Sequence, residues 1–154
     1  ISVRLVGSEM CIRDSISPFQ KKLFPGTIAC LEELKSIGFQ LHIITNGFEE
    51  VQYIKLENCG LDRFFDVVVC SEAVGKNKPA RAIFQYALKK AGCSAENAIM
   101  IGDDFRADIS GAMNSGMKAI HFDPNGLSEE NHPYTCKSLS EMPLMVTQLL
   151  LASN

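Results

Sequence analysis

The hydrophobic positions from about residue 19 onward fall into two alternating kinds of stretch. Apolar residues at helical spacing, followed in each case by a glycine, occur in Gly26–Ile37, Glu49–Cys59, Pro79–Ala91 and Asp104–Ser115. Shorter apolar runs of strand length lie between or after these stretches, at Phe39–Thr45, Phe65–Ser71, Ala98–Gly102 and Lys118–Phe122. Apolar residues three to four positions apart predict helices packed on one face, and a glycine after the last turn is typical of a helix end.

This alternation of strands and helices predicts right-handed β–α–β units and a parallel sheet, so the expected fold class is α/β. The run Val67–Val69 is typical of a strand buried on both faces. Residues 123–137 contain two prolines and few apolar positions, and they predict a long surface loop. Ser138 and Glu141 have the spacing of a capping box, which predicts a C-terminal helix continuing to Leu151.

Residues 1–15 lack the regularity of the rest of the chain. Their apolar positions follow no clean period of 2 or 3.6, and Arg4, Glu9 and Arg13 interrupt the run that a signal peptide would need. The segment resembles translated adapter or vector sequence, so we interpret it as non-native and exclude it from the expected fold. The alternative is a genuine strand at Val3–Val6, which a buried, sheet-paired position would support.

Charge and hydropathy exclude two classes of partner. The 154 residues include 15 Lys and Arg against 18 Asp and Glu, a net charge of −3, and the isoelectric point is near 5.6. This balance predicts neither a nucleic-acid partner nor an anionic membrane partner. No apolar run approaches the roughly 18–20 residues that span a bilayer. The oligomeric state is left open.

The six cysteines are widely and irregularly spaced, and no Cys-x-x-Cys occurs. A zinc site or a disulfide scaffold is therefore not expected. Several of these thiols fall at apolar positions of the periodic stretches, where free cysteine behaves as a small hydrophobe. The pattern predicts reduced thiols in a cytoplasmic protein.

Polar residues with complementary chemistry follow three of the predicted strands. They are Thr45, Asn46 and Gly47 after the first strand, Lys78 after the second, and Asp103, Asp104 and Asp108 after the third. Because ligands of an open parallel sheet bind beyond the carboxyl ends of the strands, these residues predict one shared site. A hydroxyl, backbone N–H groups and an amine neutralise phosphate oxygens, and carboxylates supply the hard oxygen ligands that Mg²⁺ requires. Each group alone has a simpler interpretation, as a turn, a solvated lysine or a helix cap.

In this order the three groups resemble motifs of the haloacid dehalogenase (HAD) superfamily of aspartyl phosphohydrolases. LHIITNG resembles its second motif, GKNKP its third and IMIGDDFRADISGAMNSGM its fourth, and the similarity extends from about Leu23 to Asn125. The resemblance implies a three-layer Rossmann-like core, Mg²⁺ as cofactor and a small phosphorylated substrate. The roles it implies are phosphate binding by Thr45 and Lys78, beside Asn46 and Gly47, metal binding by Asp103 and Asp104, and a supporting role for Asp108.

The sequence FPG before an amphipathic helix, followed by TNG and KP, is most similar to the nucleotidase-type subgroup of this superfamily. That subgroup acts on small phosphomonoesters, including pyrimidine nucleotides. The resemblance also implies a division of the chain, with a HAD-like core over residues 26–154 and a remnant of a cap or hinge over residues 16–25. Because cap residues usually set specificity, the substrate itself is left open.

The chain departs from the superfamily at the first motif. That motif is Asp-x-Asp after an N-terminal strand, where the first Asp attacks phosphorus and the second is the general acid and base. No Asp-x-Asp occurs in the sequence. We therefore expect a sheet that lacks its first strand, with reduced stability. We also expect the chain to be inactive, as the C-terminal part of a hydrolase whose intact parent forms an aspartyl-phosphate.

Two other functions stay open. A receiver-type phosphoacceptor domain also carries acidic groups, Thr and Lys at the ends of a parallel sheet. In that domain the acidic pair and the acceptor Asp come first, whereas here Thr45 and Lys78 precede the acidic pair. The other possibility is a non-catalytic phosphate-binding, metal-binding or interaction module that has lost its nucleophile.

Overall fold

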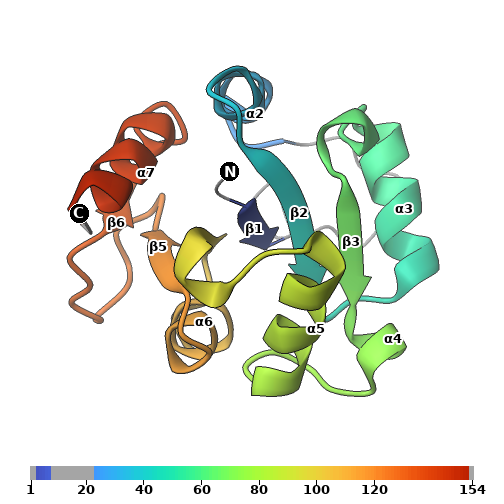
Figure 1. Cartoon of the computed structure of the whole chain (residues 1–154). Coiled ribbons are helices and arrows are strands. Elements are labelled where there is room, and N and C mark those ends of the chain that lie inside the picture. Colours follow the sequence, from blue (N-terminus) through green and yellow to red (C-terminus); the bar gives the residue numbers. More distant parts are fainter. Residues whose placement is uncertain (1–2, 8–22, 153–154) are drawn as a thin grey trace.

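A single parallel sheet organises the part of the chain that the computed structural model describes, residues 3–7 and 23–152 (Figure 1). Its strands are β1 (Val3–Gly7), β2 (Gln40–Thr45), β3 (Val67–Cys70), β4 (Ala98–Gly102), β5 (Lys118–Phe122) and β6 (Thr135–Cys136). The spatial order is β3-β2-β1-β4-β5-β6, and each neighbouring pair is parallel. The expected α/β class with a parallel sheet is confirmed.

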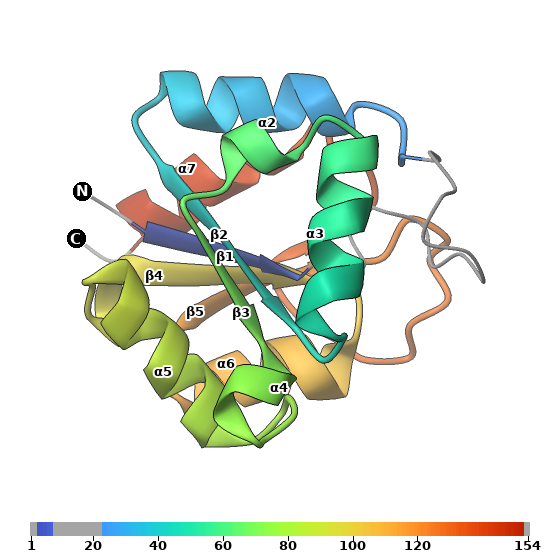
Figure 2. The same cartoon turned by 90° about the vertical axis from the view of Figure 1, so that its right-hand side faces the viewer.

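Helices cover both faces of this sheet (Figure 2). The α-helices are α2 (Thr27–Ser36), α3 (Glu49–Asn58), α4 (Ser71–Val74), α5 (Arg81–Ala91), α6 (Gly111–Asn114) and α7 (Met142–Leu151). Short 3-10 helices lie at η1 (Asp62–Phe64) and η2 (Ala95–Asn97), and a π-helix lies at η3 (Phe105–Ser110). The helix predicted over residues 104–115 is thus divided into η3 and α6, while the other predicted helices form as single segments.

Side chains of the central strands alternate between two cores. In β2, Leu41 and Ile43 belong to the core under α2 and α7, whereas Ile44 belongs to the core under α5 and α6. In β4, Ile101 likewise belongs to the core under α2 and α7, and Met100 belongs to the core under α5 and α6. This is the period of two that a strand imposes, and the strands are apolar almost throughout because both faces are covered. Burying each of these side chains contributes about 1.5–3 kcal/mol relative to leaving it exposed.

The centre of the sheet differs from the sequence expectation. β1 lies between β2 and β4, with Val6 paired with Ile43 on one side and with Ile101 on the other. The structure therefore corrects the expectation of a sheet without its first strand. A gap between β2 and β4 would leave two rows of backbone N–H and C=O groups unpaired, and a short apolar segment of many sequences can pair with both. The sheet pairing favours the strand alternative for residues 3–6.

Two interpretations, the non-native origin of residues 1–15 and the cap or hinge remnant at residues 16–25, stay predictions, since residues 8–22 lie outside the described part.

Three smaller features of the fold differ from the sequence expectation. β3 is an edge strand whose first two residues are half-buried, so it is not buried on both faces. β6 forms inside the predicted loop of residues 123–137 and pairs with the end of β5. α7 begins at Met142 rather than after a Ser138 cap, because the Ser138 hydroxyl contacts Ser140 outside the helix.

Two further expectations concern the thiols and the membrane. Among the described cysteines, Cys70, Cys93 and Cys136 are free thiols, as the prediction of reduced cysteines expects. In the same part of the chain, every helix is too short or too polar to reach across a bilayer.

Candidate functional site

The end of β2 holds a buried hydroxyl at the carboxyl edge of the sheet. Thr45 is fully buried, and its Oγ1 accepts a hydrogen bond from the N–H of Gly47 at 3.0 Å. The chain passes very close to its neighbours here, since a Cβ at residue 47 would clash with the side chain of Gln52 and lie 3.3 Å from Thr45 Oγ1. A larger residue in this turn would require the Gln52 side chain to move. A hydroxyl that accepts one bond can still donate its own hydrogen to an anion.

The next residue, Asn46, connects this turn to the loop that carries Lys78. Its side-chain Oδ1 accepts a hydrogen bond from the backbone N–H of Lys78 at 2.7 Å, and its Nδ2 donates to the backbone C=O of Lys78 at 3.3 Å. Lys78 precedes a cis peptide bond to Pro79. One amide side chain thus satisfies both polar groups of one residue in a loop outside helix and strand.

The side chain of Lys78 reaches in the other direction, to Asp108. Its Nζ lies 2.6 Å from Asp108 Oδ1, and the two side chains are only 3% and 1% exposed. The contact is a hydrogen-bonded ion pair between groups 30 residues apart in the sequence. Charges removed from water need a partner, so each of these groups holds the other in place.

The carboxylate of Asp108, a residue of η3, contacts the backbone just after the end of β4. Asp108 Oδ2 accepts a hydrogen bond from the N–H of Asp104 at 3.3 Å, and Asp104 Oδ1 caps η3 by accepting from the N–H of Ala107 at 2.7 Å. A Cβ at residue 102 would collide with the Asp108 side chain, so Gly102 is required for this close approach. π-helical segments such as η3 are frequently found at functional sites.

Asp103 lies at the end of β4, with its side chain exposed. Its backbone C=O lies 3.2 Å from Nε2 of His121, a residue of β5 that is 2% exposed. Because a carbonyl only accepts, Nε2 carries the hydrogen in this contact. The ring of His121 also packs edge-on against Phe105, with 5.4 Å between ring centroids. The loop that carries Asp103 and Asp104, here called the acidic loop, therefore contacts buried His121, which packs against half-buried Phe105.

The acidic residues can supply part of a metal shell. Among the side chains of residues 23–152, no group of three or more His, Cys, Asp or Glu is arranged to hold a metal ion. Mg²⁺, however, is commonly held by one or two carboxylates together with waters and substrate phosphate oxygens. The exposed carboxylates of Asp103 and Asp104 fit that requirement as hard oxygen donors. Metal binding by these two residues stays a prediction.

A thiol near this edge of the sheet is chemically inert. Cys70 ends β3 and is buried, and burial together with the nearby carboxylates of Glu49 and Glu72 raises the pKa of its thiol to about 11. At neutral pH the sulfur therefore stays protonated, and the thiolate is the form that acts as a nucleophile. The thiol is unsuited to a catalytic role.

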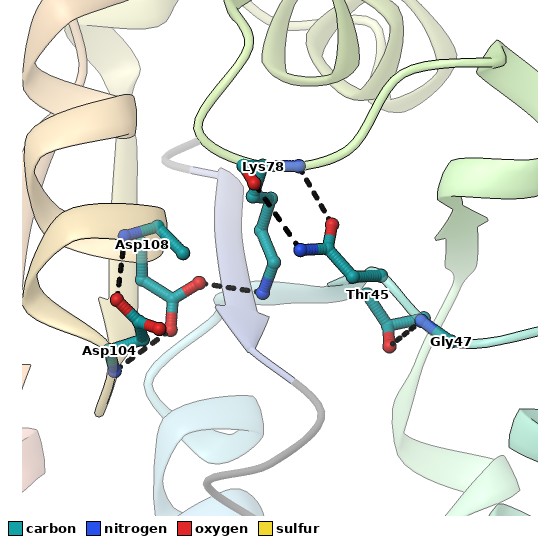
Figure 3. Close-up of polar contacts among 7 residues, drawn as sticks. Thr45, Gly47, Lys78, Asp104 and Asp108 are labelled. Carbon is teal, nitrogen blue, oxygen red and sulfur yellow. Dashed lines mark hydrogen bonds and ion pairs between the residues drawn. The ribbon is translucent and has the colours of Figure 1, made fainter.

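The structure joins most of the residues predicted from the sequence through a series of contacts. Thr45 adjoins Asn46, whose amide binds the backbone of Lys78. Lys78 pairs with Asp108, which in turn binds the N–H of Asp104. The residues predicted at three separate strand ends are therefore gathered at one edge of the sheet, beside the central strand (Figure 3).

Two supporting residues were not assigned from the sequence. The Ser71 hydroxyl donates to the backbone C=O of Asn46 at 3.1 Å. Its position directly after β3 is a signal that could have identified it, because the other site residues also follow strands. His121 lies within β5, and the alternation of that strand gives no sign of its contact with Asp103.

Comparison with known proteins agrees with this geometry. The family model of haloacid dehalogenase-like hydrolases matches residues 11–122. The chain is 46% identical over 97 residues to a glyceraldehyde 3-phosphate phosphatase of Methanothermobacter thermautotrophicus, covering 63% of this chain and 43% of that protein. It is 40% identical over 94 residues to the pyrimidine 5'-nucleotidase YjjG of Escherichia coli, covering 60% of this chain and 41% of that protein.

The fold comparison leads to the same group of proteins. The magnesium-bound putative HAD-hydrolase YfnB of Bacillus subtilis superposes with a TM-score of 0.77 at 29% sequence identity, covering 84% of this chain and 57% of that one. The matched region spans less than half the length of the two curated relatives above.

Proposed function

Because the chain belongs to the haloacid dehalogenase-like hydrolases, we propose that it forms the phosphate-binding part of a phosphomonoester hydrolase. The observation that carries this proposal is the buried Lys78–Asp108 pair, tied through Asn46 to the turn that holds Thr45. Relatives that are named phosphatases and a 5'-nucleotidase support it.

The chemistry of the site suits a phosphoryl group. The Thr45 hydroxyl and the backbone N–H groups of the turn after it are donors to phosphate oxygens, and the Lys78 ammonium offsets their charge. Asp108 holds that ammonium at a fixed position through the 2.6 Å contact. Groups held before the ligand arrives need little reorganisation to stabilise charge.

A divalent cation is compatible with this arrangement. Asp103 and Asp104 would hold Mg²⁺ with water and phosphate oxygens, and the ion would neutralise negative charge on the phosphoryl group. The contact of His121 with the backbone of Asp103 keeps the acidic loop in place at the end of β4.

We propose that the 154-residue chain alone binds phosphate without turning over phosphomonoesters. The superfamily mechanism needs an Asp nucleophile and a second Asp to protonate the leaving oxygen, and no Asp-x-Asp occurs in the sequence. In a complete enzyme, the nucleophile would attack phosphorus while Thr45 and Lys78 hold the phosphoryl oxygens. The substrate class is a small phosphorylated metabolite, with sugar phosphates and pyrimidine nucleotides as the first compounds to assay.

The test is a titration with inorganic phosphate followed by amide NMR, together with a p-nitrophenyl phosphate assay in the presence of Mg²⁺. We expect shifts at Gly47, Lys78 and Asp104, affinity lowered about tenfold by Lys78→Met, and no hydrolysis. Lys35→Met is the matched control, since Lys35 forms an exposed pair with Asp66. Equal phosphate affinity for both variants, or no binding at all, would refute phosphate binding at this site. Hydrolysis by the wild-type chain would refute its inactivity.

A further inference from the structure

We propose that Asn46 is a positioning residue that sets the place of the Lys78 ammonium through the backbone of Lys78. For its effect on phosphate this inference rests on the proposed function, but its geometry does not. The two hydrogen bonds from the Asn46 side chain to Lys78 span 2.7 and 3.3 Å, and both go to the backbone rather than to the side chain of Lys78.

The match between the two partners is specific to asparagine. The backbone of one residue offers an N–H donor and a C=O acceptor, and a primary amide offers the complementary acceptor and donor on one planar group. Aspartate keeps the acceptor but places an anionic oxygen against the Lys78 C=O. Alanine removes both contacts. Asn46 itself is fixed, because it directly follows β2 and its C=O accepts from the Ser71 hydroxyl at 3.1 Å.

Lys78 needs such a support because of where it lies. Residues 75–80 fall between α4 and α5, outside helix and strand, so no regular ladder holds the backbone of Lys78. Its ammonium is nevertheless almost fully buried, 2.6 Å from a carboxylate. A backbone displacement of about 1 Å is enough to spoil a charge-assisted hydrogen bond, since such bonds need donor–acceptor distances close to 2.7–2.9 Å.

The first experiment measures the accessibility of Lys78 directly and needs no ligand. The folded chain and its Asn46→Ala and Asn46→Asp variants are treated with an acetylating reagent, and modification of each lysine is followed by mass spectrometry. We expect Lys78 to react about tenfold faster in both variants, relative to exposed Lys89 in the same sample. Asn97→Ala is the matched control, because the Asn97 amide contacts Ser94 at the surface away from the site.

Asn46→Asp is the second variant should Asn46→Ala fail to fold, because it retains one of the two contacts. Circular dichroism and amide exchange of β4 separate local release of Lys78 from global unfolding. Folded variants in which Lys78 remains as protected as in the wild type would overturn the proposal.

The second experiment is a double-mutant cycle on phosphate affinity. If Asn46 acts through Lys78, Asn46→Ala weakens phosphate binding about tenfold in the wild type and has no effect in a Lys78→Met background. If the loss persists without the lysine, Asn46 contacts phosphate directly and the positioning role is refuted. If the wild type binds no phosphate, the proposed function fails while the labelling experiment still decides the role of Asn46.

Discussion

Removing one charge from the buried Lys78–Asp108 pair is predicted to destabilise the chain far more than removing both. Asp108→Asn and Lys78→Met preserve most of the side-chain volume and delete one charge each. Both partners are nearly inaccessible to water, at 3% and 1% exposure, so the remaining charge has no solvent to replace its partner. The carboxylate would also keep its contact with the Asp104 N–H but lose the 2.6 Å ammonium contact.

The expected size follows from the cost of removing one partner from a buried ion pair. Breaking a buried pair by removing one partner costs about 3–5 kcal/mol, whereas replacing both partners by neutral groups is often close to neutral. For a chain of about this length, 1 kcal/mol shifts the midpoint of thermal unfolding by roughly 2–4 °C. Each single variant should therefore unfold about 6–20 °C lower. The double variant should recover a large part of this loss.

Urea unfolding of the four proteins gives the free energies and the coupling between the two sites. The exposed pair of Lys35 and Asp66, at 3.1 Å with side chains 33% and 48% exposed, provides a control with the same residue types. Lys35→Met and Asp66→Asn should each cost about 1 kcal/mol or less, since water replaces the partner. Equal losses for the exposed and buried pairs, or a double variant whose loss is the sum of the single losses, would refute the reasoning.

Three further predictions concern single positions. Burial is the largest cause that lowers the pKa of His42 below its usual 6.5. The unfolded chain therefore binds the proton more readily than the folded chain, and acidification below about pH 6.5 should lower the free energy of unfolding. In urea unfolding from pH 5 to 8, the free energy of unfolding should fall less steeply on acidification for His42→Leu than for the wild type, and identical pH profiles would contradict this. Iodoacetamide at pH 8 should modify Cys70 at least about tenfold more slowly than half-buried Cys59, because the pKa of the Cys70 thiol is raised to about 11. Equal modification rates of the two thiols, measured by mass spectrometry, would be inconsistent with that pKa. A Cβ at residue 111 would lie 2.7 Å from the ring of Phe84, so Gly111→Ala should cost about 1–3 kcal/mol in urea unfolding, and an unchanged midpoint would show that the ring moves freely.

Much of the fold could be predicted because local signals and tertiary packing agree. The apolar runs at residues 98–102 and 118–122 match β4 and β5 at both ends. The glycines that end the predicted helices supply positive φ angles, as Gly92 does after α5. The edge position of β3 and the pairing of β6 were not predicted, because strand order depends on partners distant in sequence.

The candidate site was predicted in part for a related reason. Residue type and position after a strand were enough to select Thr45, Lys78 and Asp108, which the structure joins through contacts. The two-sided contact of Asn46 with the Lys78 backbone was not predictable, since it depends on the path of a loop 32 residues away. The same holds for His121, whose contact with Asp103 bridges neighbouring strands.

The central strand shows why the fold and the activity of this chain can be separated. Pairing of β1 with β2 and β4 uses backbone groups that every residue except proline carries, so the sheet accepts an apolar segment of many sequences. Catalysis needs particular side chains at the end of that strand, between the strand ends that carry Thr45 and Gly102. No Asp-x-Asp follows Val3–Gly7 in the sequence. A strand can therefore complete the sheet and still leave the site without its nucleophile, so a folded chain that binds phosphate without hydrolysis is the expected combination.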